Sequence, residues 1–487
     1  MSLNGCMVGP DFKAPAAPAV KSYTEKPLPK KTVATPLTTS GGKSQQFIMG
    51  QDIPGEWWTL FQSASLNRLI MLGMENSPNL ASAMMTLKQS EETLKAQIES
   101  TMYPSVNGQL QGERQRFSAA TFGATTSPPS EFNLYNATVN VSYTLDVFGA
   151  NRRQIEALRA QVDYEAFQLQ AAYLTLTSNI VTTAITAASL QAQIKATNEL
   201  VKSHEKQLTI VQRQFLLGGV SKADVLSQVV QLEQTQATLP PLQTQLAQAK
   251  YALAVLVGEF PGNSQIPDFN LSSLQLPTKL PVSLSSNLVR QRPDIRASEA
   301  LLHEASAQVG VATANLFPQI TLNGAYGYTA NNTNTLFTRQ ANTWDYTGGL
   351  TQPIFNAGAL QSQRRAAIDA YKAANAEYQE TVLLAFQNVA DTLRALENDA
   401  KTLRAEKAAE VAAKKSLSLT QSQFQLGGVS YISLLNAEQQ YQQSKIATIQ
   451  AEATRYADTA ALFQALGGGW WNRQPNKLEK NNVKNVA

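Results

Sequence analysis

The chain has 487 residues, of which 43% are hydrophobic and 16% are charged, and its formal net charge is +4. The charged fraction is low for a globular protein, and we find no dense basic patch with interleaved aromatic residues, which argues against nucleic acid as a partner. A single cysteine excludes an intramolecular disulfide framework, and two distant histidines argue against a metal site. No run reaches the ~18 apolar residues of a transmembrane helix, so any membrane span would have to be closed β-structure.

The N-terminal segment is predicted to be extended and lipid-anchored. Residues 9 to 43, here called the strap, are rich in Pro, Lys, Thr and Ala and have no apolar period. Leu3-Asn-Gly-Cys6 resembles the lipobox of bacterial lipoproteins, which implies a covalent lipid on Cys6; we expect no other cofactor. By the same resemblance, Met7 after this cysteine favours sorting to the outer membrane. The alternative is an unmodified N-terminal cysteine.

The chain contains an internal duplication, because four short motifs recur in the same order about 210 residues further on. The clearest motif is Phe215–Leu226, whose Gly-Gly-Val-Ser core returns within Phe424–Leu435. The predicted segments are an N-terminal lipobox-like start with the strap (1–60), a first repeat (61–260), a Pro-rich linker (261–283), a second repeat (284–470) and a polar tail (471–487).

Each repeat is predicted to contain very long helices, at about 150–257 in the first and about 358–465 in the second. Residues 150 to 214 lack Pro and Gly and repeat apolar residues every seven positions in two stripes, which indicates a supercoiled helix packed against two neighbours. At ~1.5 Å per residue, this helix is about 100 Å long. Glycine pairs then end each long helix, and returning helices are expected at 221–257 and 431–465. A further helix is expected over 66–102.

Strands are predicted before the long helices, at about 105–148 and about 319–356. In residues 136 to 146, Val139, Val141 and Tyr143 alternate with Thr, Asn and Ser. Segments of about ten residues that alternate in this way, with aromatic residues near their ends, are typical of transmembrane β-strands. The alternative is a half-buried sheet of a soluble protein.

Closure of the sheet favours a trimer. Two strand pairs give four strands, whereas a barrel needs about eight. Three copies would supply twelve strands and twelve long helices, and cyclic symmetry is common among homo-oligomers. The predicted fold class is therefore a mixed α and β membrane protein. Its duplicated protomer has coiled-coil helices and four β-strands, and the trimer forms a 12-strand transmembrane β-barrel and a 12-helix α-barrel.

Motifs along nearly the whole chain carry a family resemblance. They are Gly5-Cys-Met-Val-Gly-Pro-Asp-Phe12, Trp57-Trp58, Arg290-Gln-Arg-Pro-Asp-Ile-Arg296, Phe317-Pro318, Leu426-Gly-Gly-Val429, Leu434-Leu-Asn-Ala437 and Leu466-Gly-Gly-Gly-Trp470. With these motifs the chain resembles the TolC-like outer membrane factors, specifically the lipoprotein branch (the NodT and OprM kind) that serves RND-type efflux pumps. The Arg-Pro-Asp-Ile-Arg run is the most specific element.

The resemblance implies an outer-membrane exit duct that conducts substrates passively and extends into the periplasm as the helical barrel. It also implies three kinds of partner besides membrane lipid: two further copies of the chain, a periplasmic adaptor (membrane fusion) protein and an inner-membrane RND transporter. Since the transporter supplies the energy, we expect no enzyme activity, no catalytic residues and no metal ligands.

The resemblance also implies a periplasmic gate just after the second helical turn. The matching positions, here called the gate residues, are Ile432, Ser433 and Asn436. Many relatives carry Asp where this chain has Asn436, so we expect an uncharged gate with Ile432 as its apolar part, because apolar constrictions close pores by dewetting. Asp224 on the first turn is the candidate for a nearby acidic ring. The alternative is ordinary packing or solvation of helix tips.

The two glycine turns are the candidates for adaptor contact, with exposed residues at their tips. The predicted contact residues are Gly218, Gly219, Val220 and Ser221 in the first turn and Gly427, Gly428, Val429 and Ser430 in the second. The alternative, which is compatible with contact, is that the glycines provide left-handed backbone at a helix end.

Other conspicuous residues are interpreted as structural. The Arg290–Arg296 run is expected to fix a helix start through Asp294 and local ion pairs, and the tryptophan pairs are expected to pack. His204 and His303 are expected to be packed or solvated. The competing functions are a type I secretion channel, a coiled-coil structural or surface protein and an enzyme. No phosphate loop, metal-spaced cluster or Ser–His arrangement supports an enzyme.

Overall fold

The computed structural model describes residues 7–20, 22–36, 40–118 and 130–473. Cys6 and most of the predicted C-terminal tail lie outside this part of the chain. Two compact units are present, and both draw on the two repeats. The first consists of Met1–Pro15, Thr86–Ala166 and Ala297–Gln379, and the second of Ala16–Met85, Phe167–Arg296 and Glu380–Ala487.

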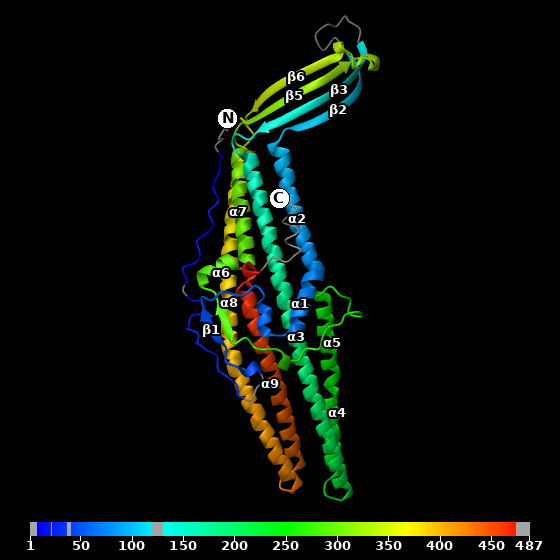
Figure 1. Ribbon diagram of the computed structural model, residues 1–487, viewed down its shortest axis with the longest axis vertical. Coiled ribbons are helices and arrows are strands. Elements are labelled where there is room, and N and C mark those ends of the chain that lie inside the picture. Colours follow the sequence, from blue (N-terminus) through cyan, green and yellow to red (C-terminus); the bar gives the residue numbers. More distant parts are fainter. Residues whose placement is uncertain (1–6, 21, 37–39, 119–129, 474–487) are drawn as a thin grey trace. The chain divides into compact units, whose positions relative to one another are not determined.

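The two longest helices are α3 (Ala150–Leu216) and α8 (Ala359–Gln425), each of 67 residues, as the heptad periodicity predicted (Figure 1). After α8 the chain returns as one helix, α9 (Tyr431–Ala465). After α3 it returns as two, α4 (Lys222–Ala237) and α5 (Leu239–Leu256), so the single helix expected over 221–257 is wrong. Pro240 and Pro241 explain the break, because they lie in the first turn of α5, where a missing N–H does no harm. Among the described residues, no helix is both long and apolar enough to cross a membrane.

A proline break also divides the helix expected over 66–102. The structure has α1 (Ala64–Asn76) and α2 (Pro78–Met102) in its place, and the second repeat has α6 (Ser285–Gln291) and α7 (Pro293–Ala314). In both repeats the residue before the proline is extended, as the clash with a proline ring demands. The duplication therefore includes this break.

The first unit contains a four-stranded antiparallel sheet in the order β2-β3-β5-β6. The strands are β2 (Ser105–Phe117), β3 (Ser130–Leu145), β5 (Gln319–Ala330) and β6 (Asn342–Thr351). Their register places Val139 opposite Tyr326, and Tyr326 opposite Trp344, so the predicted apolar residues share one face. Much of that face is exposed, with Leu110 at 81% and Tyr346 at 79%.

The second unit holds a smaller sheet that the sequence did not predict. Strand β1 (Gln46–Met49) lies in the N-terminal segment and pairs in parallel with β4 (Lys279–Val282) from the predicted linker. Each strand has only four residues, which is too short for a pattern of alternation to be recognised. The pair attaches the N-terminal segment to the body of this unit.

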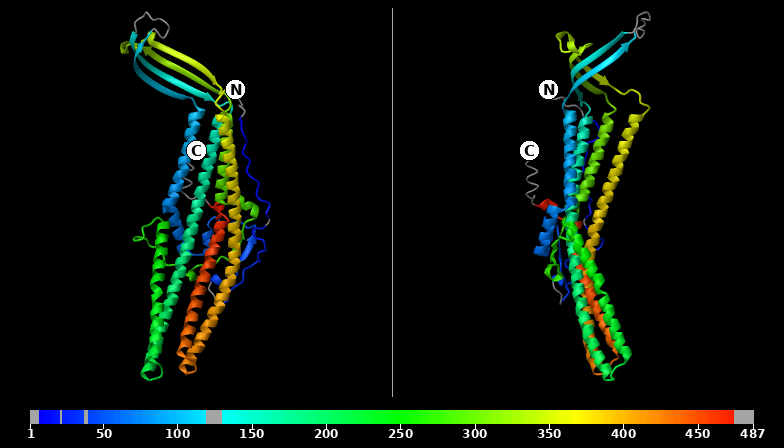
Figure 2. Two further views of the ribbon diagram at one scale, coloured as in Figure 1. Left: turned by 180° about the vertical axis from the view of Figure 1, so that it is seen from behind. Right: turned by 90° about the vertical axis from the view of Figure 1, so that its right-hand side faces the viewer.

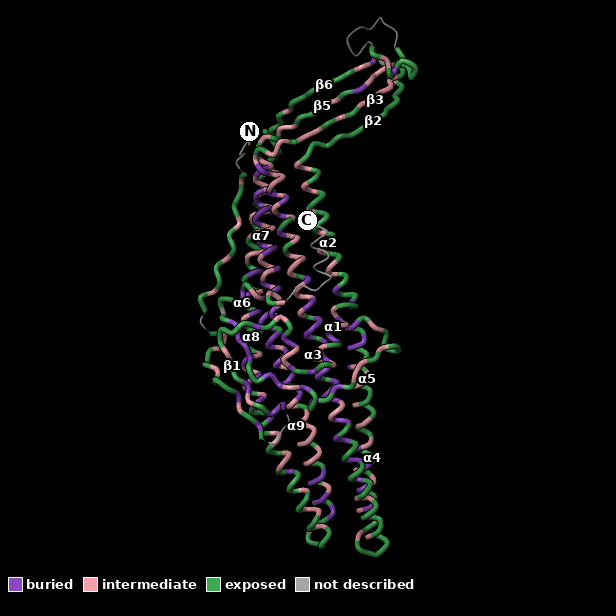
Figure 3. The backbone as a smooth tube through the Cα atoms, viewed as in Figure 1, coloured by how far each residue is buried: buried purple, intermediate pink, exposed green. Residues whose placement is uncertain are grey.

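Buried aromatic and charged residues fix the middle of the second unit. Trp57 is fully buried and stacks on Phe463 at a centroid distance of 5.4 Å. Arg292 binds Asp294 in the first turn of α7 at 2.6 Å and donates to the carbonyl of Ala465 at 3.0 Å. The structural interpretations of the first tryptophan pair and of Arg292 with Asp294 are therefore confirmed. Figure 3 shows buried residues along the helices and exposed ones at the turns.

Candidate functional site

The two glycine turns end α3 and α8 with the same hydrogen bonds. The Gly219 N–H donates to the Gln214 carbonyl at 2.8 Å, and the Gly428 N–H repeats this bond with Gln423. Only the first glycine of each pair has a left-handed backbone that favours glycine, with φ of +78° at Gly218 and +75° at Gly427. Figure 2 shows the two turns at the same end of the second unit.

Serine caps begin both returning helices. Ser221 and Asp224 form a capping box on α4, in which the Asp224 carboxylate accepts from the Ser221 N–H at 2.9 Å and from its hydroxyl at 2.7 Å. Ser430 accepts from the Ser433 N–H at the start of α9. An acidic ring at Asp224 would therefore use a carboxylate that already accepts two hydrogen bonds.

The three gate residues lie on one face of α9. Ile432 is 66% exposed, and Ser433 and Asn436 are also exposed, whereas the neighbouring Tyr431 and Leu434 are buried. Positions i, i+1 and i+4 of a helix share a face, so the structure brings the three together on a surface that this chain leaves uncovered. Asp224 stands apart from them, on α4.

The residues exposed at the tips of the two glycine turns are not all the expected ones. Ser221 and Ser430 are exposed, but Val220 and Val429 are half-buried, so the expectation that both valines are exposed is wrong. Val220 packs against a buried apolar cluster, which explains its position. The exposed apolar residues are instead the leucines before the glycines: Leu216 (82%), Leu217 (86%) and Leu426 (87%).

That apolar cluster joins the two repeats near the turns. Its buried members are Val211 of α3, Val225 of α4, and Tyr431 and Leu434 of α9. These side chains contact one another, which removes their apolar surface from water. This burial stabilises the packing of the two helical hairpins, α3–α4 and α8–α9. The face of α9 opposite to the gate residues is thus the one that holds the hairpins together.

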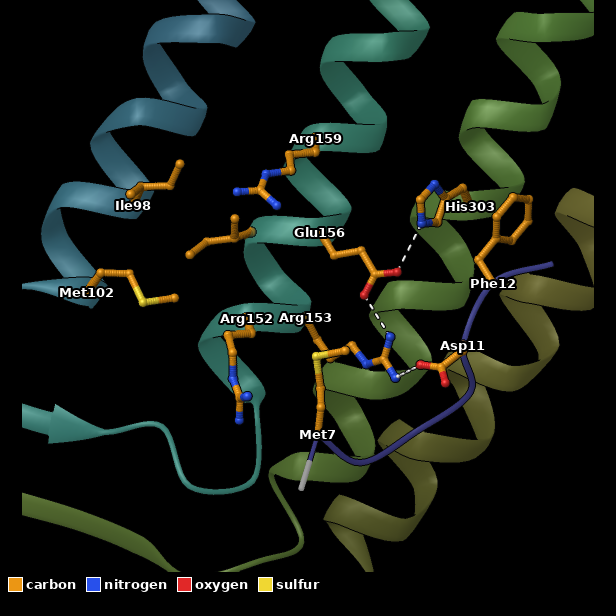
Figure 4. A pocket seen from close by; sticks show the side chains of 11 residues that line it. Met7, Asp11, Phe12, Ile98, Met102, Arg152, Arg153, Glu156, Arg159 and His303 are labelled. Carbon is orange, nitrogen blue, oxygen red and sulfur yellow. Dashed lines mark hydrogen bonds and ion pairs between the residues drawn. The ribbon is translucent and has the colours of Figure 1, made fainter. Parts of the chain in front are cut away.

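A second candidate site anchors the start of the strap in the first unit (Figure 4). The side chain of Arg153, on α3, is 1% exposed and binds Asp11 at 2.8 Å and Glu156 at 2.7 Å. It also donates to the carbonyls of Val8 and Gly9 at 3.2 and 3.3 Å. The pKa of Arg153 is raised, because these two carboxylates outweigh the burial that would lower it. Sequence reasoning missed this residue, because its partners in the N-terminal segment are about 140 positions away.

A cavity of about 510 Å³ lies beside this anchor. Apolar side chains of α2 and α3 line it together with Arg152, Arg159 and the Arg153 cluster. His303 donates from Nε2 to Glu156 Oε1 at 3.0 Å and stacks on Phe12 with ring centroids 4.4 Å apart. His303 is therefore packed rather than solvated, and it helps to fix the strap.

Comparison with known proteins identifies the family. The sequence matches the outer membrane efflux protein family over residues 69–259 and 284–468. The chain belongs to the outer membrane efflux protein family. The efflux function and the outer-membrane location expected from the sequence are thereby confirmed, and so is the resemblance on which they rested.

Individual relatives of this outer membrane efflux protein match almost end to end. The cation efflux system protein CusC of Escherichia coli O157:H7 is 26% identical over 471 residues, which cover 96% of this chain and 97% of CusC. The probable outer membrane lipoprotein SilC of Salmonella typhimurium is 26% identical and covers 96% of each chain. The solved outer-membrane channel OprN superposes with a TM-score of 0.85 at 25% identity, covering 96% of this chain and all of OprN. The mixed fold of long helices and strands is that of such channels.

Proposed function

We propose that three copies of this chain form a closed duct that conducts efflux substrates passively from the periplasm through the outer membrane. The observation that carries the proposal is the four-stranded sheet, which has an exposed apolar face and two strands paired on one side only, β2 and β6, in the described part of the chain. Unpaired strand edges recruit further strands, and lipid tolerates no unpaired backbone. Three sheets of four strands close at twelve.

The two faces of the sheet suit lipid on one side and water on the other. On the polar face, Ser142 donates to Asn323 at 2.7 Å, and Asn140 lies 3.5 Å from Gln109. Amides and hydroxyls of this kind hydrate a lumen without strong charge selectivity. Much of the apolar face is exposed in the described part of the first unit, and lipid is the environment that would remove it from water.

The helices supply the periplasmic part of the proposed duct. The gate residues would line its entrance, and the turns would contact an adaptor protein that leads to an RND transporter. Exposed Leu216, Leu217 and Leu426 add apolar contact area to the predicted turn residues. Because the transporter provides the energy, the proposal assigns the chain no catalytic residue, no metal and no enzyme activity.

A lipid on Cys6 remains part of the proposal. Support comes from the position of Met7, the next residue, which packs against Gly149 at the start of α3 while Val8 donates to the Phe148 carbonyl at 3.2 Å. Met7 and Val8, which follow the proposed lipid-bearing cysteine in the sequence, thus lie beside the end of β3 in the first unit. Labelling with radioactive palmitate should mark the wild-type chain and leave Cys6→Ser unmarked, and equal labelling of both would remove the assignment.

A pair of neighbouring substitutions tests the duct. Val139 is 48% exposed on the apolar face, and Thr138 lies on the polar face. An arginine facing lipid costs about 2–4 kcal/mol at the membrane midplane, so Val139→Arg should lower the amount of membrane-inserted trimer. Thr138→Arg is the matched control and should insert normally but change ion conductance in planar bilayers. Equal insertion of both, or a soluble monomer without conductance, would contradict the proposal.

A further inference from the structure

Four buried polar side chains meet between the two helical hairpins, on the face of α9 opposite to the gate residues. They are His204 of α3, Gln228 of α4, and Tyr431 and Glu438 of α9, here called the buried quartet. The side chains of His204 and Glu438 are 2% and 4% exposed, Gln228 is fully buried and Tyr431 is 5% exposed. The sequence suggested only that His204 is packed or solvated; the structure makes it part of a contact between the repeats.

Hydrogen bonds fix the orientation of Gln228 within the buried quartet. Its Nε2 donates to the main-chain carbonyl of His204 at 3.1 Å and lies 3.4 Å from the Nδ1 of the same residue. Its Oε1 accepts from the Tyr431 hydroxyl. The amide therefore links the imidazole on α3 to the phenol on α9, and neither of its ends is free to turn.

Glu438 has no such fixed partner. Its Oε2 approaches His204 Nδ1 to 3.3 Å, and apart from this approach neither carboxylate oxygen has a hydrogen-bond partner among the described residues. An isolated charge at such a site is strongly unfavourable, so the pair is stable when its net charge is zero. One shared proton satisfies this condition, either as imidazolium with carboxylate or as imidazole with carboxylic acid.

The groups around the buried quartet offer little to neutralise an unpaired charge on His204 or Glu438. Burial, Glu438 and the Asp224 carboxylate of α4 raise the pKa of Tyr431, which keeps the phenol neutral. Glu205 and Lys206 of α3, Glu233 of α4, and Lys414 and Lys415 of α8 are at the surface. Lys407 and Glu410 of α8 are half-buried but paired with each other at 2.7 Å. On α9, Lys445 is paired with Glu199 of α3 at 2.7 Å.

We propose that the buried quartet is a proton-operated latch that holds the two helical hairpins together while His204 and Glu438 share one proton, and that gain of a second proton releases it. A second proton leaves an imidazolium beside a neutral acid, a buried net charge of +1. Loss of the shared proton leaves a carboxylate beside a neutral imidazole, a net charge of −1. Both changes weaken packing between α3–α4 and α9, so the hairpins separate more often on either side of an intermediate pH.

The latch deepens the proposed function, since only that proposal makes this end of the helices a channel entrance. It also differs from the gate. Asn436 does not titrate, so acid sensitivity at this end would come from behind the gate residues, through movement of the helix that carries them. Linkage limits the effect, because uptake of one proton changes an opening equilibrium by at most tenfold per pH unit.

Hydrogen exchange of the full purified chain between pH 4.5 and 8.5, corrected for intrinsic rates, tests the latch. In the wild type, amides of Lys222–Ala237 should exchange most slowly at an intermediate pH and faster, by up to tenfold per unit, towards acid. Glu438→Gln leaves only the imidazole and should loosen towards acid. His204→Gln leaves only the carboxyl and should reverse the trend, loosening as pH rises. The double variant should be independent of pH.

Glu205→Gln is the matched surface control and should keep the wild-type profile. The latch would be overturned if exchange in the wild type did not depend on pH, or if the double variant kept the wild-type pH dependence. If a variant fails to fold, the pH dependence of exchange in the wild type decides alone. Conductance in planar bilayers separates the two proposals. A conducting chain with a flat exchange profile rejects the latch and keeps the duct, whereas a pH-dependent profile without conductance at any pH rejects the duct.

Discussion

Arg455 offers a direct test of how the strap is held. This residue of α9 is fully buried, and its guanidinium donates to the carbonyls of Gly41 and Lys43 at 2.8 and 2.7 Å. It also binds Thr32 Oγ1 at 2.9 Å and Gln45 Oε1 at 3.3 Å. Burial lowers the pKa of Arg455 to about 10, which still leaves it cationic at neutral pH. Replacement by methionine keeps the volume and removes every donor.

The expected effect depends on the acceptors left behind. Each buried acceptor without a partner costs about 1–3 kcal/mol, and loss of the buried charge offsets part of the total. A net loss of about 3 kcal/mol is the expected size for Arg455→Met. Because each 1.4 kcal/mol changes an equilibrium constant tenfold, the fraction of molecules with a detached strap should rise on the order of 100-fold.

Limited trypsin digestion measures this fraction, because the rate of cleavage of a transiently detached segment depends on its equilibrium population. The exposed Lys30, Lys31 and Lys43 provide cleavage sites in and beside the contact. Arg404→Met, at an exposed position of α8, is the control and should be cut at the wild-type rate. If Arg455→Met were cut no faster than the control, other contacts would hold the strap and the role assigned to Arg455 would be refuted.

Three further predictions concern the entrance and the middle of the helices. Asn436→Asp should make the duct cation-selective and Ile432→Ala should raise its conductance; single-channel recordings unchanged in both variants would remove the gate assignment. A cysteine at Ser221 or Ser430 should cross-link to a co-expressed adaptor, and no adduct at either position would count against contact at the turns. Burial, followed by the hydrogen bond and charge of a neighbouring carboxyl, raises the pKa of Asp399 from 3.8 to about 7, so the folded chain binds this proton more tightly than the unfolded chain. Thermal stability should therefore fall as pH rises through that window, and Asp399→Asn should flatten the dependence; an unchanged slope would refute it.

Local signals in the sequence were sufficient for the long elements. The seven-residue spacing along α3 and the alternation along β3 are properties of one segment, so they could be read without knowing its neighbours. The helix breaks were also encoded locally, at Pro78 and Pro240, but the apolar period on both sides concealed them. Proline in the first turn of a helix is compatible with such a period.

The buried contacts could not be predicted in the same way. His204 and Glu438 come from different repeats, and Arg153 meets residues of the strap that have no pattern of their own. Nothing in the spacing of a lone histidine or arginine on a helix indicates which distant segment will cover it. The alternation along the strands, by contrast, predicted the sheet faces correctly but left the interior of the second unit unspecified.

The two helical hairpins have diverged unequally, since two prolines divide the returning helix of the first and none divides that of the second. Both turns nevertheless keep the sequence Leu-Gly-Gly-Val-Ser, at Leu217–Ser221 and Leu426–Ser430. On a three-fold assembly, a partner that recognises this shared sequence meets six equivalent places. A partner that recognises the next residue along the chain, Lys222 in one turn and Tyr431 in the other, meets three. The number of copies of the proposed adaptor that bind would thus depend on which of these residues it contacts.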